Sequence, residues 1–148
     1  MSRIISFRGK IADLGTETIV LHTRDGTTGY RIKKLEVMSI QPGVLNESHV
    51  LQIFTVAKTD TSFYDNIDFS DTTLLAAAFL QQDDQNYNPG FESISFDNTV
   101  FNQDIYVTHA DVVGSAAINY HIELEKITLD LNENTVATLK DIRSTTQV

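Results

Sequence analysis

The sequence contains no cysteine, only two prolines and no long hydrophobic run. Without cysteine there can be neither a disulfide framework nor a thiolate metal site, so we expect a protein made in a reducing compartment or indifferent to redox state. The longest apolar run covers seven residues, Leu74 to Leu80, far fewer than the roughly 20 that cross a bilayer. The first residues have no small-residue cleavage site of the kind that ends a signal peptide. A soluble protein with no membrane partner is therefore expected.

Positive charge is also missing from the middle of the chain. Residues 59–125 contain twelve Asp and Glu but no Lys or Arg, whereas residues 1–34 contain seven basic and three acidic side chains. An acidic body repels phosphate, which argues against a nucleic-acid partner. Two interpretations of the uneven charge remain open: solubility with intramolecular pairing, or a basic leading segment that docks on an acidic surface. The second interpretation predicts a partner interface made by Arg3, Ile4, Ile5, Phe7, Arg8 and Lys10.

The most regular stretch of the sequence runs from Ile118 to Leu131. Apolar side chains alternate with polar ones from Ile118 to Leu124, which predicts a half-buried strand at the centre of an antiparallel sheet. After Glu125 the apolar positions resume one residue out of phase, at Ile127, Leu129 and Leu131. A slip of one residue moves side chains to the opposite face unless a bulge absorbs it, so we predict a bulge or a strand break at Glu125–Lys126.

The other predicted strands are short and separated by turn residues. They cover 18–22, 30–37, 50–57, 92–96 and 104–109. An Asp25–Gly26 turn predicts that the first two form a hairpin. Leu74 to Leu80 fits a capped Ala-rich helix or a strand buried on both faces, and the strand is favoured. Residues 1–12 read as an N-terminal arm or an edge strand, 59–71 and 81–90 as loops, and 134–143 as a short helix.

Seven to nine short strands with regular turns predict one all-β domain over residues 1–148. The expected architecture is an antiparallel β-sandwich of jelly-roll type with a short C-terminal helix.

No group of residues predicts catalysis, a cofactor or a metal site. The four histidines, His22, His49, His109 and His121, have no metal-ligand spacing, although His109 and His121 would be neighbours if their strands paired. Asp65, Asp68 and Asp71 recur at every third position without a calcium-loop motif, and such Asp residues usually cap turns. Glu123 and Glu125 fit a solvated strand face better than a glycosidase pair. The sequence therefore predicts a protein that is not an enzyme.

Three segments carry a resemblance to a known family. They are Asp104–His109 with Gly114–Ser115, then Ile118–Glu125, and the closing TVATLKDIR; Tyr30–Val37 and Phe69–Ala78 match more loosely. Over residues 30–143 the chain resembles small virion proteins of marine tailed bacteriophages, taken to be capsid cement or decoration proteins. The resemblance implies a jelly-roll-like fold, assembly in several copies as a dimer or trimer, and binding to the major capsid protein. The protein would be made in the host cytoplasm and end on the outer surface of the virion.

Two alternatives stay open at this stage. A tail or neck subunit of the same particle would share the structural character. A carbohydrate-binding β-sandwich module would use loop aromatics such as Tyr64, Tyr87 or Phe91 as stacking platforms.

Overall fold

Eight strands and one 3₁₀ turn account for the regular structure in this computed structural model, which describes residues 3–23, 26–42, 46–82 and 91–129. The strands are β1 (Arg3–Ile11), β2 (Thr16–Ile19), β3 (Thr28–Ser39), β4 (Glu47–Phe54), β5 (Leu74–Gln82), β6 (Phe91–Phe96), β7 (Ile105–Asp111) and β8 (Ile118–Thr128). The 3₁₀ turn η1 covers Thr61–Phe63. The helix predicted over 134–143 lies outside the described residues.

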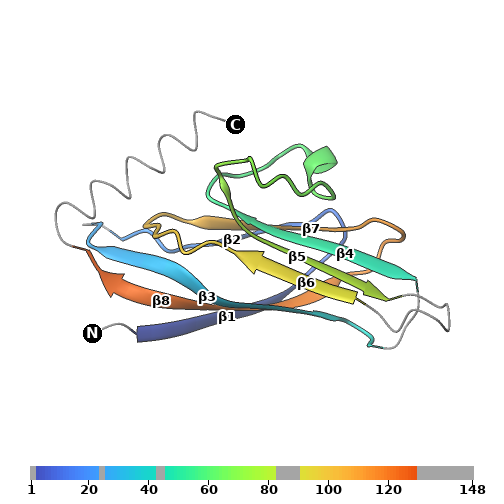
Figure 1. Cartoon of the computed structure of the whole chain (residues 1–148), viewed down its shortest axis with the longest axis horizontal. Helices are drawn as coiled ribbons and strands as arrows, with labels where there is room; N and C mark the ends of the chain where they lie inside the picture. The colour runs from blue at the N-terminus through green and yellow to red at the C-terminus, as the bar shows by residue number, and fades with distance from the viewer. Residues whose placement is uncertain (1–2, 24–25, 43–45, 83–90, 130–148) are drawn as a thin grey trace.

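The strands form two antiparallel sheets that pack face to face (Figure 1). One sheet has the order β1-β8-β3, and the other has the order β2-β7-β4-β5-β6. The first strand, β1, pairs with the last, β8; the second, β2, pairs with the second last, β7; and the two middle strands, β4 and β5, pair with each other. This is the pairing of a jelly roll. The predicted all-β sandwich is confirmed.

The fourth pair of a jelly roll would join β3 to β6, but these two strands do not pair, and a single bridge links β3 to a residue beyond the end of β6. β6 pairs with β5 instead and extends the larger sheet to five strands. The chain then crosses to the other sheet, where Phe101 and Tyr30 exchange two backbone hydrogen bonds of 2.8 and 2.9 Å. Both side chains are buried and their rings stack at 6.4 Å. The part of the chain that would form the sixth strand of a jelly roll is thus divided, with β6 in the larger sheet and Phe101 at the edge of the smaller one.

The strand β8 is the central strand of the smaller sheet, as predicted. Ile118, Ile122 and Leu124 have no exposed surface, and Tyr120 is 4% exposed. The predicted bulge at Glu125–Lys126 is wrong, because β8 pairs without a shift along β1 from Ile118 to Lys126. The register shift lies across the sheet in β3, between Ile32 and Lys34.

The apolar residues that follow Glu125 out of phase point away from the face that carries Leu124, and no bulge is needed for this. Ile127 pairs with Gly29, on the face opposite to Leu124. Leu129 lies against Gly29, where an added Cβ atom would come within 2.9 Å of the leucine side chain. A glycine on β3 therefore makes the room that the second apolar set needs.

The apolar run at Leu74 forms β5, which confirms the strand over the helix. Ala76 and Ala78 belong to the core between the sheets. Ala77 points to the other face and is still only 4% exposed. Segment 55–73, drawn in green with the short helix in Figure 1, lies over this outer side of the sheet. Burial on both faces explains why the run has no polar alternation.

The predicted hairpin across Asp25–Gly26 is wrong. Gly26 has the positive φ of 66° that such a turn needs. However, β2 pairs with β7 in the larger sheet, and β3 pairs with β8 in the smaller one. Burial of the two strands, and not a turn signal between them, decides which sheet each one joins.

The first residues form an edge strand and not an arm. β1 pairs with β8 over nine residues, and Ile5 and Phe7 pack against the core. Tyr120 lies over Gly9, where an added Cβ atom would be 3.0 Å from the ring. Its hydroxyl donates a 2.9 Å hydrogen bond to Glu17 of the other sheet. Burial and this bond raise the pKa of Tyr120 well above its usual value. β1 is therefore an integral part of the sandwich.

Across the described ranges, no helix has the length and apolar character needed to cross a membrane.

Candidate functional site

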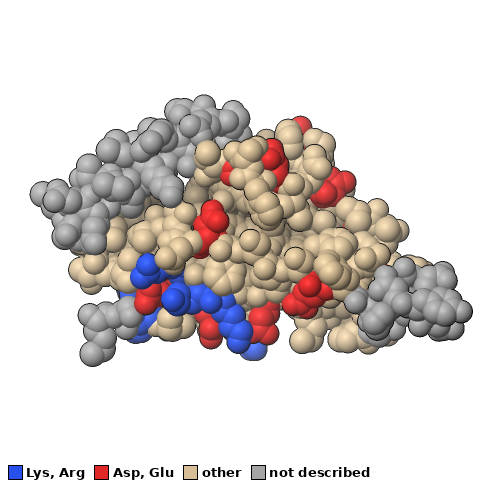
Figure 2. All heavy atoms as spheres, viewed as in Figure 1, with Lys and Arg blue, Asp and Glu red and all other residues tan. Residues whose placement is uncertain are grey.

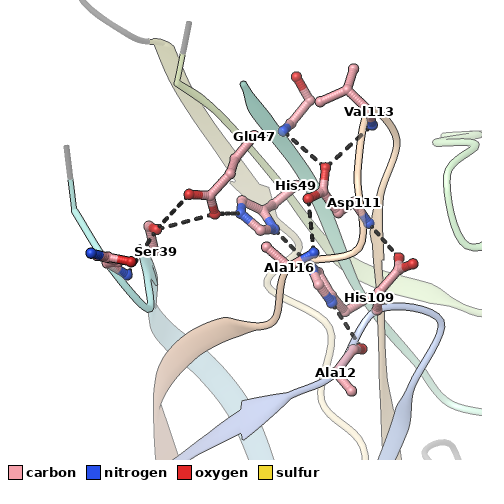
Figure 3. Close-up of polar contacts among 11 residues, drawn as sticks. Ala12, Ser39, Glu47, His49, His109, Asp111, Val113 and Ala116 are labelled. Carbon is pink, nitrogen blue, oxygen red and sulfur yellow. Dashed lines mark hydrogen bonds and ion pairs between the residues drawn. The ribbon is translucent and has the colours of Figure 1, made fainter. Parts of the chain in front are cut away.

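The most polar part of the interior lies where β3 ends and β4 begins (Figure 3). Glu47 and His49 come from β4, and His109 and Asp111 come from the neighbouring strand β7. His49 pairs with Asp111, and Leu51 pairs with His109, two residues further along. Alternate pairs share a face, so His49 and His109 both point toward the core. Neither histidine has any exposed surface.

These side chains form a continuous hydrogen-bonded chain between the sheets. Ser39, the last residue of β3, donates to both carboxylate oxygens of Glu47, at 3.2 and 3.3 Å. Glu47 Oε1 lies 2.7 Å from His49 Nε2, and His49 Nδ1 lies 2.8 Å from His109 Nε2. The chain ends where His109 Nδ1 meets the carbonyl oxygen of Ala12 at 3.0 Å. The two imidazole rings also stack, with centroids 5.1 Å apart.

The contact with Ala12 and the burial of His109 decide which ring nitrogen donates between the two histidines. The Ala12 carbonyl only accepts, so His109 Nδ1 carries a hydrogen. Burial lowers the pKa of His109 against the opposing effects of the Ala12 carbonyl, Asp13 and Asp111, so its ring is neutral and Nε2 accepts. His49 Nδ1 must then donate. On its other side, His49 Nε2 contacts Glu47 Oε1 at 2.7 Å.

Asp111 holds the loop beside the two histidines. Its carboxylate accepts backbone N–H bonds from Ser48 and Val113 at 3.2 Å and from Ala116 at 3.1 Å. Burial raises the pKa of this carboxyl, but the three N–H donors together bring it below its ordinary value. The Asp111 N–H donates to Asp13 at 2.8 Å. The cluster therefore joins β4, β7, the β1–β2 turn and the loop after β7.

A side chain without exposed surface touches no substrate in this conformation. The cluster of Ser39, Glu47, His49 and His109 is thus arranged to close one end of the sandwich with satisfied polar groups, which fixes the approach of the two sheets. Across the described residues no three His, Asp or Glu side chains gather in a way that would hold a metal ion.

The sequence did not predict this cluster. The sequence predicts a strand over 50–57, whereas β4 begins at Glu47 and so includes Glu47 and His49. The strands of His109 and His121 do not pair, because β7 and β8 lie in different sheets, so the condition for their being neighbours is not met. His109 meets His49, which is 60 residues away in the sequence. Glu47 and His49, two residues apart and directly before the apolar part of the strand, were the available signal.

The predicted interface residues lie on the two faces of β1. Ile5 and Phe7 face the core and are half-buried, whereas Arg3, Ile4, Arg8 and Lys10 are exposed. Within the described residues, Arg3, Arg8 and Lys10 form no ion pair. No described strand pairs with the outer edge of β1. The structure thus keeps three of the basic groups open to solvent along a free strand edge.

Other basic residues are paired within the smaller sheet. Arg31 contacts Glu125 across the β3–β8 pair, with Nη2 at 2.6 Å and Nε at 2.8 Å from the same oxygen. Lys34 pairs with Glu36 at 2.9 Å. Figure 2 shows Lys and Arg gathered in the lower part of the view, over the smaller sheet, whereas Asp and Glu lie both among them and in the upper part. Intramolecular pairing accounts for two of the three basic groups on β3, those of Arg31 and Lys34.

The remaining residues singled out from the sequence have structural roles. Asp68 and Asp71 cap turns through Ser70 and Thr73, as the turn interpretation predicted. Tyr64 is only 4% exposed and donates to the Lys58 carbonyl oxygen at 2.6 Å, so it offers no stacking platform. Phe91 is 55% exposed on β6. Tyr87 lies outside the described residues.

The comparisons with known proteins give no family. No protein-family model matches the sequence, and no curated protein matches it. Among solved structures, the Yersinia pseudotuberculosis-derived mitogen matches with a TM-score of 0.31 and 12% identity, over 88% of this chain and 89% of that one. A likeness of this degree carries no argument, and the fold assignment rests on the strand pairings above.

Proposed function

We propose that this protein is a non-enzymatic virion structural protein, a capsid cement protein that binds the major capsid protein on the outer surface of a phage shell. The proposal combines the sequence resemblance to such proteins with one structural observation. β1 is a nine-residue strand with a free edge among the described residues, and it carries exposed Arg3, Ile4, Arg8 and Lys10.

A free strand edge presents a row of unsatisfied N–H and C=O groups, and a partner strand can pair with them. Exposed charges contribute only about 0–1 kcal/mol each, so the backbone and apolar contacts would supply most of the affinity. The three cations would set orientation and speed the encounter with an acidic surface.

A hollow beside β1 extends the same surface. It has a volume of about 550 Å³ and lies on the outer face of the smaller sheet, between Arg8, Met38 and His121. Met38 is 60% exposed there. Flexible, exposed methionine is common at surfaces that adapt to a protein partner. Edge and hollow together form one continuous candidate interface, which we call the β1 face.

The first test is composition. Purified virions of the phage that encodes this chain should contain it at a fixed ratio to the major capsid protein, as measured by quantitative mass spectrometry. A few copies per particle would instead indicate the tail or neck alternative. Absence from the virion would disprove the proposal.

The second test addresses the β1 face. The variant Arg3→Glu/Arg8→Glu/Lys10→Glu should fold normally but bind shells that lack the protein with a much slower association rate, because the attraction becomes repulsion. Lys33→Glu changes an exposed base on β3, the opposite edge strand of the same sheet, and serves as the matched control. Equal binding by the triple variant and the wild type would exclude the β1 face.

A further inference from the structure

A second hollow lies on the far side of the molecule from the β1 face. It has a volume of about 480 Å³ and opens between the outer side of β4 and the segment 55–73 that covers it. The sequence predicts a loop over most of this segment, with Tyr64 as a stacking platform in the carbohydrate-binding alternative, but Tyr64 is buried. The hollow shares no residue with the β1 face or with the buried histidines.

Two aromatic rings line the hollow. Phe54, at the end of β4, is 3% exposed and lies under the Lys58 ammonium group, 5.0 Å from its ring centroid. Lys58 is held there by Asp71, whose Oδ2 is 3.0 Å from Nζ. Phe63, on η1, is 53% exposed. The hollow thus has a buried aromatic base and a second ring that is open to a ligand.

Fixed polar groups surround these rings. Asp60 Oδ1 accepts from the Ser62 N–H at 3.0 Å, and Asp68 Oδ1 accepts from the Ser70 N–H at 2.9 Å. The hydrogen bonds to these serines keep the pKa of both carboxyls below its usual value, so both are ionised acceptors at neutral pH. Within the described residues, Asp68 Oδ2 and the side-chain amide of Asn66 have no hydrogen-bond partner.

The segment that carries these groups is anchored firmly. The Tyr64 hydroxyl lies 2.6 Å from both the Lys58 carbonyl oxygen and the Thr16 hydroxyl. The Gln52 amide, which is 1% exposed, donates to the carbonyl oxygens of Phe63 and Tyr64 at 3.2 Å. The hollow is therefore preformed, and a ligand would not need to order the loop first.

We propose that this hollow binds a neutral saccharide. The apolar C–H face of a sugar ring stacks on an exposed aromatic ring, while its hydroxyl groups donate to carboxylates and pair with an amide. Phe63 supplies the ring, and Asp60, Asp68 and Asn66 supply the polar partners. Three carboxylates, of Asp60, Asp68 and Asp71, against one ammonium group disfavour an anionic ligand.

The test uses ¹⁵N-labelled full-length protein and four neutral oligosaccharides: cellotetraose, maltotetraose, laminaritetraose and triacetylchitotriose. At least one of them should shift the amide resonances of residues 54–72 in a saturable titration. Phe63→Ala should then weaken binding by about tenfold, the effect of losing one stacking contact. Asp68→Asn keeps the turn oxygen but replaces the free acceptor, and should also weaken binding.

Phe69→Ala is the matched control. Phe69 is 74% exposed on the same segment but lines a different hollow, next to Phe96. It should retain the affinity of the wild type, and thermal melting should show that all three variants are folded. No response in residues 54–72 to any of the four sugars at about 10 mM would overturn the proposal, as would an equal loss in Phe63→Ala and Phe69→Ala. This outcome is independent of binding to virions.

Discussion

At the scale of single residues, the protein places ionisable groups in its interior and gives each a partner. Glu47, His49 and His109 would each be costly to bury alone, by several kcal/mol if charged. In the chain from Ser39 to Ala12 every polar side chain has a hydrogen-bond partner. Hydrogen bonding to these partners offsets the cost of burying the cluster away from solvent.

This arrangement predicts a specific loss of stability in mild acid. The ordinary pKa of His109 is 6.5 and burial lowers it in the folded protein. Below about pH 6.5 the unfolded chain therefore binds a proton that the native protein does not. The free energy of unfolding should fall by up to about 1.4 kcal/mol per pH unit, until the folded pKa is reached. Urea unfolding between pH 7.5 and 5 measures this slope.

His109→Gln should remove that part of the slope, since glutamine does not titrate. His121→Gln, on the outer face of β8, is the matched control and should keep it. Protonation of Asp111 also destabilises the folded protein in acid. That effect begins near the ordinary pKa of 3.8, well below the pH range in which His109 acts. NMR titration of the imidazole resonances provides a direct check of the same group. If His109→Gln keeps the slope of the wild type, His109 is not neutral in the folded protein.

At the scale of elements, the sequence predicts strands well where burial is one-sided or complete. Ile118 to Leu124 alternates because one face lies on the core, and Leu74 to Leu80 is continuous because both faces of β5 are covered. The start of β4 escaped prediction for a physical reason. Glu47, Ser48 and His49 are polar, and only partners from distant segments make their burial favourable.

The strand β8 offers a sharp test of the assigned faces. Leu124 has no exposed surface, and Leu124→Asp would bury an unpaired charge at a cost of several kcal/mol. That is a large part of the total stability of about 5–15 kcal/mol, so the variant should be insoluble or unfolded. Glu123→Lys changes the neighbouring side chain, which points outward between Ser6 and Lys34, and should fold. The measurements are soluble expression and thermal melting of both variants. If Leu124→Asp folded normally, the assignment of Leu124 to the core face and Glu123 to the solvent face would be wrong.

At the scale of the whole molecule, local signals specify the class of fold but not the sheet to which a strand belongs. The Asp25–Gly26 turn predicted a hairpin, and the chain instead passes from one sheet to the other. The choice depends on pairings such as β1–β8 and β2–β7, whose members are separated by most of the sequence. The histidine cluster depends on the same pairings. A single sequence carries no direct record of them, which is why the cluster could not be found from spacing.

The closure of the sandwich by its first strand gives the last prediction. Removing residues 1–10 would leave β8 without one neighbour, expose part of its inner face, and delete the packing of Ile5 and Phe7. It would also remove Gly9, over which Tyr120 lies to reach Glu17 of the other sheet. We therefore expect the truncated protein to lose its cooperative thermal transition and to aggregate. The charge-reversal variant of β1 keeps the backbone and both apolar residues, so it should melt as the wild type does. A truncated protein that melts cooperatively near the wild-type temperature would show that β1 is a dispensable arm, and its basic residues would then be free to extend toward a partner.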